Sequence, residues 1–135
     1  MSGQRREVRS LAAPAPVGPY SQAVVHGGLV FASGQIPLDP ETGEMVGGEI
    51  EAQAQRVLAN LRAVLEAAGS SMDQVIRTSI YLTDLSLFPR VNAVYAEHFR
   101  GEPLPARSTI GVAALPLGAE IEMDVVAVSE RNPGG

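Results

Sequence analysis

The chain has 135 residues, no cysteine and a formal net charge of −5 at neutral pH. This length suits one domain, residues 1–135, that buries an ordinary hydrophobic core. The absence of cysteine excludes disulfides, a thiol nucleophile and a thiolate metal site, and it is compatible with a cytoplasmic location.

Charge and residue usage also restrict the partners. A nucleic-acid-binding face needs clustered Lys and Arg, so the acidic balance argues against one, and the lack of Trp argues against base stacking. No run approaches the roughly 20 apolar residues that a membrane helix needs. The two histidines have no paired ligand spacing, which argues against a metal site.

The ends of the chain read as flexible tails, covering residues 1 to about 10 and 130–135. Between them, the first structured segment contains Pro14, Pro16 and Pro19. Prolines restrict the preceding residue and remove a donor, so this segment should lie extended on the surface. Tyr20, which ends it, is either an aromatic lid over the core edge or a hydroxyl held at a pocket.

A β-hairpin is predicted next. Residues 23–25 and 29–33 are two apolar runs, and His26-Gly27-Gly28 separates them. Gly34 directly follows the second run. It marks either a bulge or strand end, or a place where another backbone or a ligand comes close.

Helical spacing of apolar residues predicts an amphipathic helix over residues 49–68, which Gly69 terminates. Along residues 75–82, Ile76, Thr78, Ile80 and Leu82 alternate with Val75, Arg77, Ser79 and Tyr81, and this two-residue period predicts a strand. A short second helix should enter at Pro89, with Asp84 or Ser86 as its cap. A strand, a helix and another strand in succession favour a parallel crossover.

The last two predicted strands are residues 105–111 and 120–128, and the Leu-Pro-Leu-Gly turn between them suggests that they are neighbours. That pairing would bring Arg107 close to Glu122. One face of residues 120–128 is wholly apolar and the other begins charged and ends apolar, so both faces need cover. A second copy of the chain is the economical cover for the outer face.

This order of elements predicts an α+β fold with a mixed sheet and both helices on one face. Several short motifs then carry a family resemblance. They are GPYSQA at 18–23, ASGQIP at 32–37, VNAVY at 91–95, PARS at 105–108 and IEMD at 121–124. Together, over residues 14–128, they resemble the RidA/YjgF/UK114 family of reactive-intermediate deaminases.

The resemblance implies a chorismate-mutase-like fold and a homotrimer with clefts between subunits. It also implies hydrolysis of enamines and imines of 2-amino acids, such as 2-aminoacrylate, 2-iminopropanoate and 2-iminobutanoate, to 2-keto acids and ammonia, with no metal or organic cofactor. By motif, Arg107 binds the substrate carboxylate, and Glu122 positions water or moves protons. The cleft would be lined by Tyr20, Ser33, Gly34, Asn92 and the backbone at Thr109.

Two positions depart from the pattern of the resemblance. Thr109 stands where some members have cysteine, so thiol chemistry is excluded here and only a backbone role at the cleft wall remains. Asp124 stands where the family often has a second glutamate, which keeps the charge but shortens its reach.

The individual residues also allow plainer interpretations. An Arg at a strand start is commonly a surface ion-pair partner, and a Glu on an exposed strand face is commonly just solvated. Two other functions stay open as alternatives. One is a non-catalytic module of the same fold that binds keto acids, and the other is an endoribonuclease or translation inhibitor.

Overall fold

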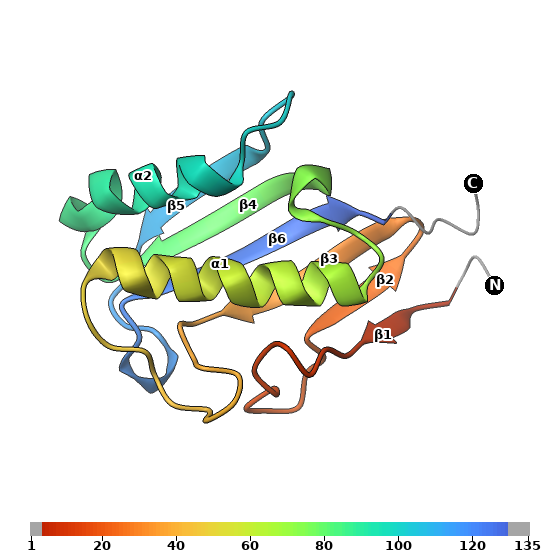
Figure 1. The fold of residues 1–135 in the computed structure, drawn as a ribbon, viewed down its shortest axis with the longest axis horizontal. Helices are drawn as coiled ribbons and strands as arrows, with labels where there is room; N and C mark the ends of the chain where they lie inside the picture. The colour runs from red at the N-terminus through yellow and green to blue at the C-terminus, as the bar shows by residue number, and fades with distance from the viewer. Residues whose placement is uncertain (1–3, 130–135) are drawn as a thin grey trace.

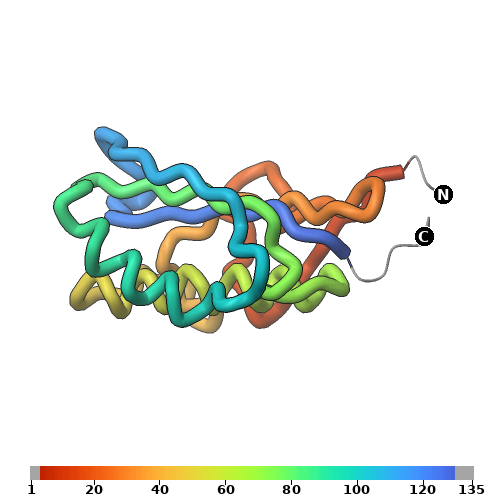
Figure 2. The backbone as a smooth tube through the Cα atoms, turned by 90° about the horizontal axis from the view of Figure 1, so that it is seen from above, coloured from red at the N-terminus to blue at the C-terminus, as the bar shows by residue number. Residues whose placement is uncertain are grey.

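The computed structural model describes residues 4–129 and contains one six-stranded sheet with two helices on one of its faces (Figures 1 and 2). The strands lie side by side in the order β1-β2-β3-β6-β4-β5. The elements are β1 (Arg6–Val8), β2 (Ala23–His26), β3 (Leu29–Gln35), α1 (Ile50–Ala67), β4 (Val75–Leu82), α2 (Phe88–His98), β5 (Ala106–Gly111) and β6 (Ile121–Val128). The predicted α+β class, mixed sheet and one-sided helices are confirmed.

The core lies between the sheet and the helices. On β6, Ile121, Met123, Val125 and Ala127 are buried and face α1, while the residues between them are half-buried on the opposite face. The apolar stripe of α1 is fully buried against this surface, as at Val57, Leu58, Leu61, Val64 and Leu65. The alternation seen in the sequence therefore places the charged residues of β6 on the face without helices.

The hairpin of β2 and β3 closes at Gly27 and Gly28, whose φ values are 61° and 81°. Both central residues of this turn lie in the left-handed region, which favours glycine and suits the twist of a two-residue hairpin. Further along β3, the pairing with β6 shifts register between Ala32 and Gln35. The predicted bulge at Gly34 is therefore present, and β3 continues through it to Gln35.

The expected pairing of the last two strands is wrong. β4 lies between β5 and β6, parallel to β5 and antiparallel to β6. The parallel crossover through α2, also predicted, is confirmed and places β5 at the edge of the sheet. The apolar β6 instead takes a central position with a neighbour on each side, which buries more of its surface than an edge position would.

The expectation of a tail up to about residue 10 is also wrong in part. Residues 6–8 form β1, which pairs with the free edge of β2. The side chain of Val8, the last residue of β1, is buried in the core. Burial of this valine and the hydrogen bonds of the added strand offset the entropy of ordering the segment. Residues 1–3 and 130–135 of the predicted tails lie outside the described residues.

The proline-rich segment after β1 is extended, as predicted, and one buried glutamine holds it in place. The side-chain oxygen of Gln22 accepts a hydrogen bond from the Ser10 amide at 2.6 Å. Its Nε2 donates to the carbonyl oxygens of Pro14 at 2.8 Å and Ser10 at 3.1 Å. The Gln22 side chain thus supplies hydrogen-bond partners to backbone groups of the proline-rich segment, which has no neighbouring strand to supply them.

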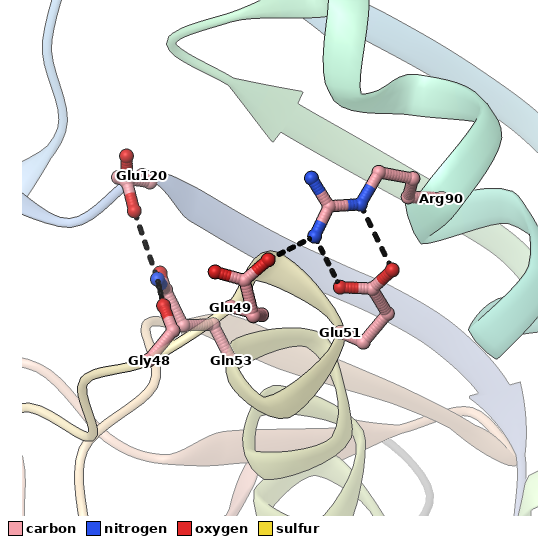
Figure 3. Close-up of polar contacts among 6 residues, drawn as sticks. All are labelled: Gly48, Glu49, Glu51, Gln53, Arg90 and Glu120. Carbon is pink, nitrogen blue, oxygen red and sulfur yellow. Dashed lines mark hydrogen bonds and ion pairs between the residues drawn. The ribbon is translucent and has the colours of Figure 1, made fainter.

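Polar contacts join the start of α1 to α2 and to β6 (Figure 3). Arg90 of α2 binds Glu51 through two nitrogens, at 2.7 and 2.9 Å, and Glu49 at 2.8 Å. The hydrogen bonds that Glu51 accepts from Arg90 are the main cause that lowers the pKa of Glu51 to about 2. Gln53 donates to Glu120, which precedes β6, at 2.8 Å and to the Gly48 carbonyl at 3.0 Å. No helix within residues 4–129 has the length and apolar character needed to cross a bilayer.

We expect Gln22→Ala to destabilise the fold by about 1–3 kcal/mol, because buried backbone groups at Ser10 and Pro14 would lose their partner. Urea unfolding at one fixed protomer concentration measures this change. The matched control is Ser21→Ala, which removes only an exposed contact of 3.4 Å to Glu7. Equal stability of the Gln22 variant and wild type would contradict the assignment.

Candidate functional site

A cavity of about 350 Å³ lies among the proline-rich segment, the end of β3 and the start of β6. Four of the residues expected at the site line it, namely Tyr20, Ser33, Gly34 and Glu122. The proline-rich segment is placed there by Gln22, and the β3 bulge turns the chain beside it. The structure therefore brings one group of the predicted residues together from segments that are far apart in the sequence.

Gly34 lies directly against the carboxyl group of Glu122. A Cβ at position 34 would overlap Oε2 of this carboxyl group. The bulge interpretation of Gly34 is confirmed. A close approach is present as well, but the group that comes close is the Glu122 side chain of the neighbouring strand and not the expected backbone or ligand. The missing Cβ leaves room for the Glu122 carboxyl at the cavity wall.

The two hydroxyl groups of the cavity already have backbone partners. Ser33 Oγ donates to the Ser21 carbonyl at 2.7 Å, and the Tyr20 hydroxyl accepts from the Val17 amide at 3.3 Å. Tyr20 is 46% exposed, so it is not a lid over the core. Its hydroxyl has accepted one hydrogen bond and still has a proton to donate toward a ligand.

The carboxyl group of Glu122 is biased toward its neutral form. Burial raises the pKa of Glu122 above its ordinary value, and the negative charge of Asp124 raises it further. Asp124 lies two residues along the same face of β6 and accepts a hydrogen bond from the Tyr81 hydroxyl at 3.1 Å. A carboxyl group whose pKa is raised can both give and take a proton nearer to neutral pH.

The second group of predicted residues lies on β5 and α2. Arg107 Nη1 donates to Asn92 Oδ1 at 2.8 Å. The guanidinium carbon lies 4.8 Å from the ring centre of Tyr95 and 5.1 Å from that of Phe88. Thr109 follows on the same side of β5 and is half-buried. Within residues 4–129, Arg107 has no carboxylate partner, so it is not the surface ion-pair residue of the plainer interpretation.

Nothing in the sequence assigned Phe88 or Tyr95 of α2 to the site. Their role at Arg107 was missed, although Phe88, Asn92 and Tyr95 are spaced four and three residues apart and so share one side of α2. Tyr95 is buried, and its hydroxyl lies 2.9 Å from Thr78 Oγ1 on β4. The aromatic rings and Asn92 together hold the guanidinium plane in a defined orientation.

The expected proximity of Arg107 and Glu122 is wrong within one chain. Arg107 on β5 pairs with Thr78 of β4. Glu122 on β6 pairs with Tyr81 of β4, which lies three residues further along that strand. The Arg107 side chain extends toward α2, and Glu122 lies on the face opposite the helices. The site residues therefore form two groups on opposite faces, the carboxyl group at the cavity and the guanidinium group on β5 and α2.

The six-stranded mixed sheet, its two helices on one face and a cavity beside a β-bulge with Glu122 in its wall define a small α+β protein. Residues 10–129 match the family model described as Endoribonuclease L-PSP. The chain belongs to this family, which is the RidA/YjgF family that the motifs indicated.

Individual relatives agree with this membership. Protein DfrA of Myxococcus xanthus is 54% identical over 127 residues, covering 93% of this chain and 96% of that protein. A protein of Dermatophagoides farinae named 2-iminobutanoate/2-iminopropanoate deaminase is 44% identical, covering 93% of this chain and 98% of that protein. The crystal structure of RidA from a Psychrobacter species is 43% identical with a TM-score of 0.87, covering 91% of this chain and 98% of that one.

We expect Asp124→Asn to lower the pKa of Glu122 toward its ordinary value without reaching it. The substitution removes the charge of Asp124, while burial, the larger cause, remains. An NMR pH titration of the Glu122 carboxyl carbon measures the change. Asp73→Asn removes an exposed carboxylate elsewhere on the chain and is the control. A Glu122 pKa that stays the same or rises in Asp124→Asn would refute the coupling.

Proposed function

We propose that this protein hydrolyses enamines and imines of 2-amino acids to 2-keto acids and ammonia. The proposal rests on the exposed guanidinium of Arg107, which Asn92 orients and which has no carboxylate partner within residues 4–129, and on the Glu122 carboxyl group at a separate cavity, whose pKa is raised. The relative named as an imine deaminase supports this activity. The absence of cysteine is compatible with a cytoplasmic location.

The proposal includes a homotrimer with a chorismate-mutase-like arrangement, whose sites combine the two groups across subunit boundaries. Neither group suffices alone, because one lacks a carboxylate-binding cation and the other lacks a proton-transferring group. The face of the sheet without helices also supports assembly, since Phe31 and Ile110 expose about half of their side chains there. Packing of this face against other copies would cover both.

The reaction needs orientation, a water molecule and proton transfers. An imine R–C(=NH)–COO⁻ and water give R–CO–COO⁻ and ammonia. An enamine first takes a proton at carbon and loses one from nitrogen to become the imine. Glu122 donates its proton to the imine nitrogen, which makes the carbon more electrophilic. The resulting carboxylate then takes a proton from the attacking water. That proton moves on from Glu122 to the amine nitrogen, the C–N bond breaks, and ammonia leaves. The Glu122 carboxylate takes the hydroxyl proton as the C=O bond forms, which restores its protonated state.

Arg107 would bind the carboxylate through two parallel hydrogen bonds. Asn92, Phe88 and Tyr95 fix its plane before the substrate arrives, so little orientation is lost on binding. The Tyr20 hydroxyl supplies a donor at the cavity, and the backbone at Thr109 lies next to Arg107 on β5. No residue in this scheme acts as a nucleophile toward the substrate.

A keto-acid-binding module without turnover remains the second candidate, because the same two groups would bind the product. Saturable binding of keto acids without any acceleration of imine hydrolysis would favour it. The description of the family model also includes an endoribonuclease. The net charge of −5 argues against that activity, since phosphate contacts need a basic face.

Arg107→Lys tests whether geometry at this position matters beyond charge. Lysine keeps the positive charge but loses the planar fork, so we expect imine hydrolysis to fall on the order of 10²-fold and Arg107→Ala to be slower still. The measurements are the rate of imine hydrolysis and the oligomeric mass of each variant and of wild type. An active Ala variant would refute carboxylate binding by Arg107, and an unfolded one would show that the residue is structural.

A mixing experiment tests the shared site directly. Glu122→Gln should reduce turnover on the order of 10²-fold, because the amide cannot move protons. When the Arg107→Ala and Glu122→Gln chains are co-expressed with different tags, about a quarter of the sites in randomly mixed trimers would combine both native residues. We therefore expect the whole co-expressed population to regain about a quarter of wild-type activity, and trimers purified through both tags to regain about a third, because each of these has one complete site among its three. Activity no higher than that of the separate variants would refute a site shared between chains.

A further inference from the structure

A hydroxyl group lies among the buried side chains of β4. The strand buries four residues, and Thr78 is the polar one beside Val75, Ile80 and Leu82. A buried hydroxyl is costly unless it is hydrogen-bonded, and Thr78 Oγ1 has a partner in the Tyr95 hydroxyl of α2 at 2.9 Å. Thr78 also pairs with Arg107 in the parallel ladder of β4 and β5. Thr78 is therefore a neighbour both of Arg107 and of the tyrosine ring that supports it.

Two contacts fix the Tyr95 ring. Its hydroxyl lies on the axis about which the ring turns, so the contact with Thr78 fixes the direction of this axis. Rotation about the axis is only loosely restrained in a free tyrosine. Packing against Phe99, with 4.3 Å between the ring centres and 30° between the ring planes, restricts that rotation here. Thr78 and Phe99 together therefore determine where the face of the Tyr95 ring lies.

Tyr95 is the most deeply buried of the three α2 residues that contact Arg107. The guanidinium carbon lies 4.8 Å from the Tyr95 ring centre and 5.1 Å from that of Phe88, and Nη1 donates to Asn92 at 2.8 Å. Tyr95 is 7% exposed, whereas Phe88 is half-buried and Asn92 is exposed. Side chains that are not buried keep more of their rotamer freedom. The orientation of the guanidinium thus depends most on the side chain that Thr78 holds.

We propose that Thr78 is a positioning residue for Arg107 and that it acts through the Tyr95 ring. The inference rests on the proposed function, in which the guanidinium binds the substrate carboxylate. Without the Thr78 hydroxyl, the Tyr95 hydroxyl is left buried and without this partner, which is costly. The ring regains a partner by moving toward water or another polar group, and the surface under Arg107 moves with it. The plainer interpretation is that the two hydroxyls only satisfy each other, in which case their loss affects stability alone.

Three substitutions separate these two interpretations. Thr78→Val replaces the hydroxyl with a methyl group of similar size, and Thr78→Ser keeps the hydroxyl. Ser70→Ala is the control for stability, because it removes another buried hydroxyl, which donates to the Val128 carbonyl at 2.6 Å beyond the end of α1. Thr78→Val and Ser70→Ala should therefore both lower the midpoint of urea unfolding, and only Thr78→Val should change the site.

The first measurement is hydrolysis of the imine that an amino acid oxidase generates from alanine. We expect kcat/KM of Thr78→Val to fall about tenfold, because a guanidinium without a fixed support must be ordered again on binding. Thr78→Ser and Ser70→Ala should match wild type. The two hydroxyls act as one contact, so adding Tyr95→Phe should not slow Thr78→Val further. Equal losses in Thr78→Val and Ser70→Ala, no loss in Thr78→Val, or additive losses in the double variant would overturn the inference.

Exchange between the two Nη groups of Arg107, measured by NMR in the ligand-free protein, separates this inference from the proposed function. Rotation about the Nε–Cζ bond causes this exchange, and a guanidinium held on a fixed ring rotates slowly. We expect the exchange to be several times faster in Thr78→Val and unchanged in Thr78→Ser and Ser70→Ala. If wild type hydrolyses no imine faster than buffer does, the proposed function fails, and this pattern of exchange still supports the inference. Exchange in Thr78→Val that equals that of wild type would reject the inference whatever the outcome for catalysis.

Discussion

The central position of β6 is the constraint on which the rest of the structure depends. Its inward side chains, Ile121, Met123, Val125 and Ala127, are buried against the helices, so they determine which face of the strand is outward. Glu122 and Asp124 must then lie together on the outward face. Because β3 is the neighbour of β6 and bulges at Gly34, the Glu122 carboxyl meets a backbone without a Cβ. Packing in the core therefore places a partly desolvated carboxyl group beside a cavity.

The same packing separates the two charged groups that the chemistry would use together. β4 lies between β5 and β6, and the parallel crossover through α2 leaves Arg107 at the edge strand. On that side, the guanidinium group packs against Phe88 and Tyr95, which are themselves held by the helix and by Thr78. One chain thus presents the Arg107 guanidinium and the Glu122 carboxyl group in different directions. Under the proposed function, this division is a physical reason for the site to be shared between copies of the chain.

The cavity owes its shape to side-chain hydrogen bonds more than to regular backbone structure. Gln22 and Asn60 are buried amides, and each donates to carbonyl groups of segments that lie outside the six-stranded sheet. The burial of such amides is costly unless they are fully paired, which makes these contacts specific. They hold proline-rich and turn segments against the sheet. An apolar lining and a polar end therefore share one small volume.

The sequence by itself determined the features that depend on local periodicity and turn chemistry. These include the helix at residues 50–67, the alternation of residues 121–128, and the Gly27-Gly28 hairpin. Its motifs also named Tyr20, Ser33, Gly34 and Glu122, which the structure brings together at one cavity. Only the tertiary structure decided that β4 separates Arg107 from Glu122, that residues 6–8 add a strand, and that Phe88 and Tyr95 flank the guanidinium. Strand order arises from competition among distant segments for burial, and no local pattern encodes which segment becomes the neighbour of which.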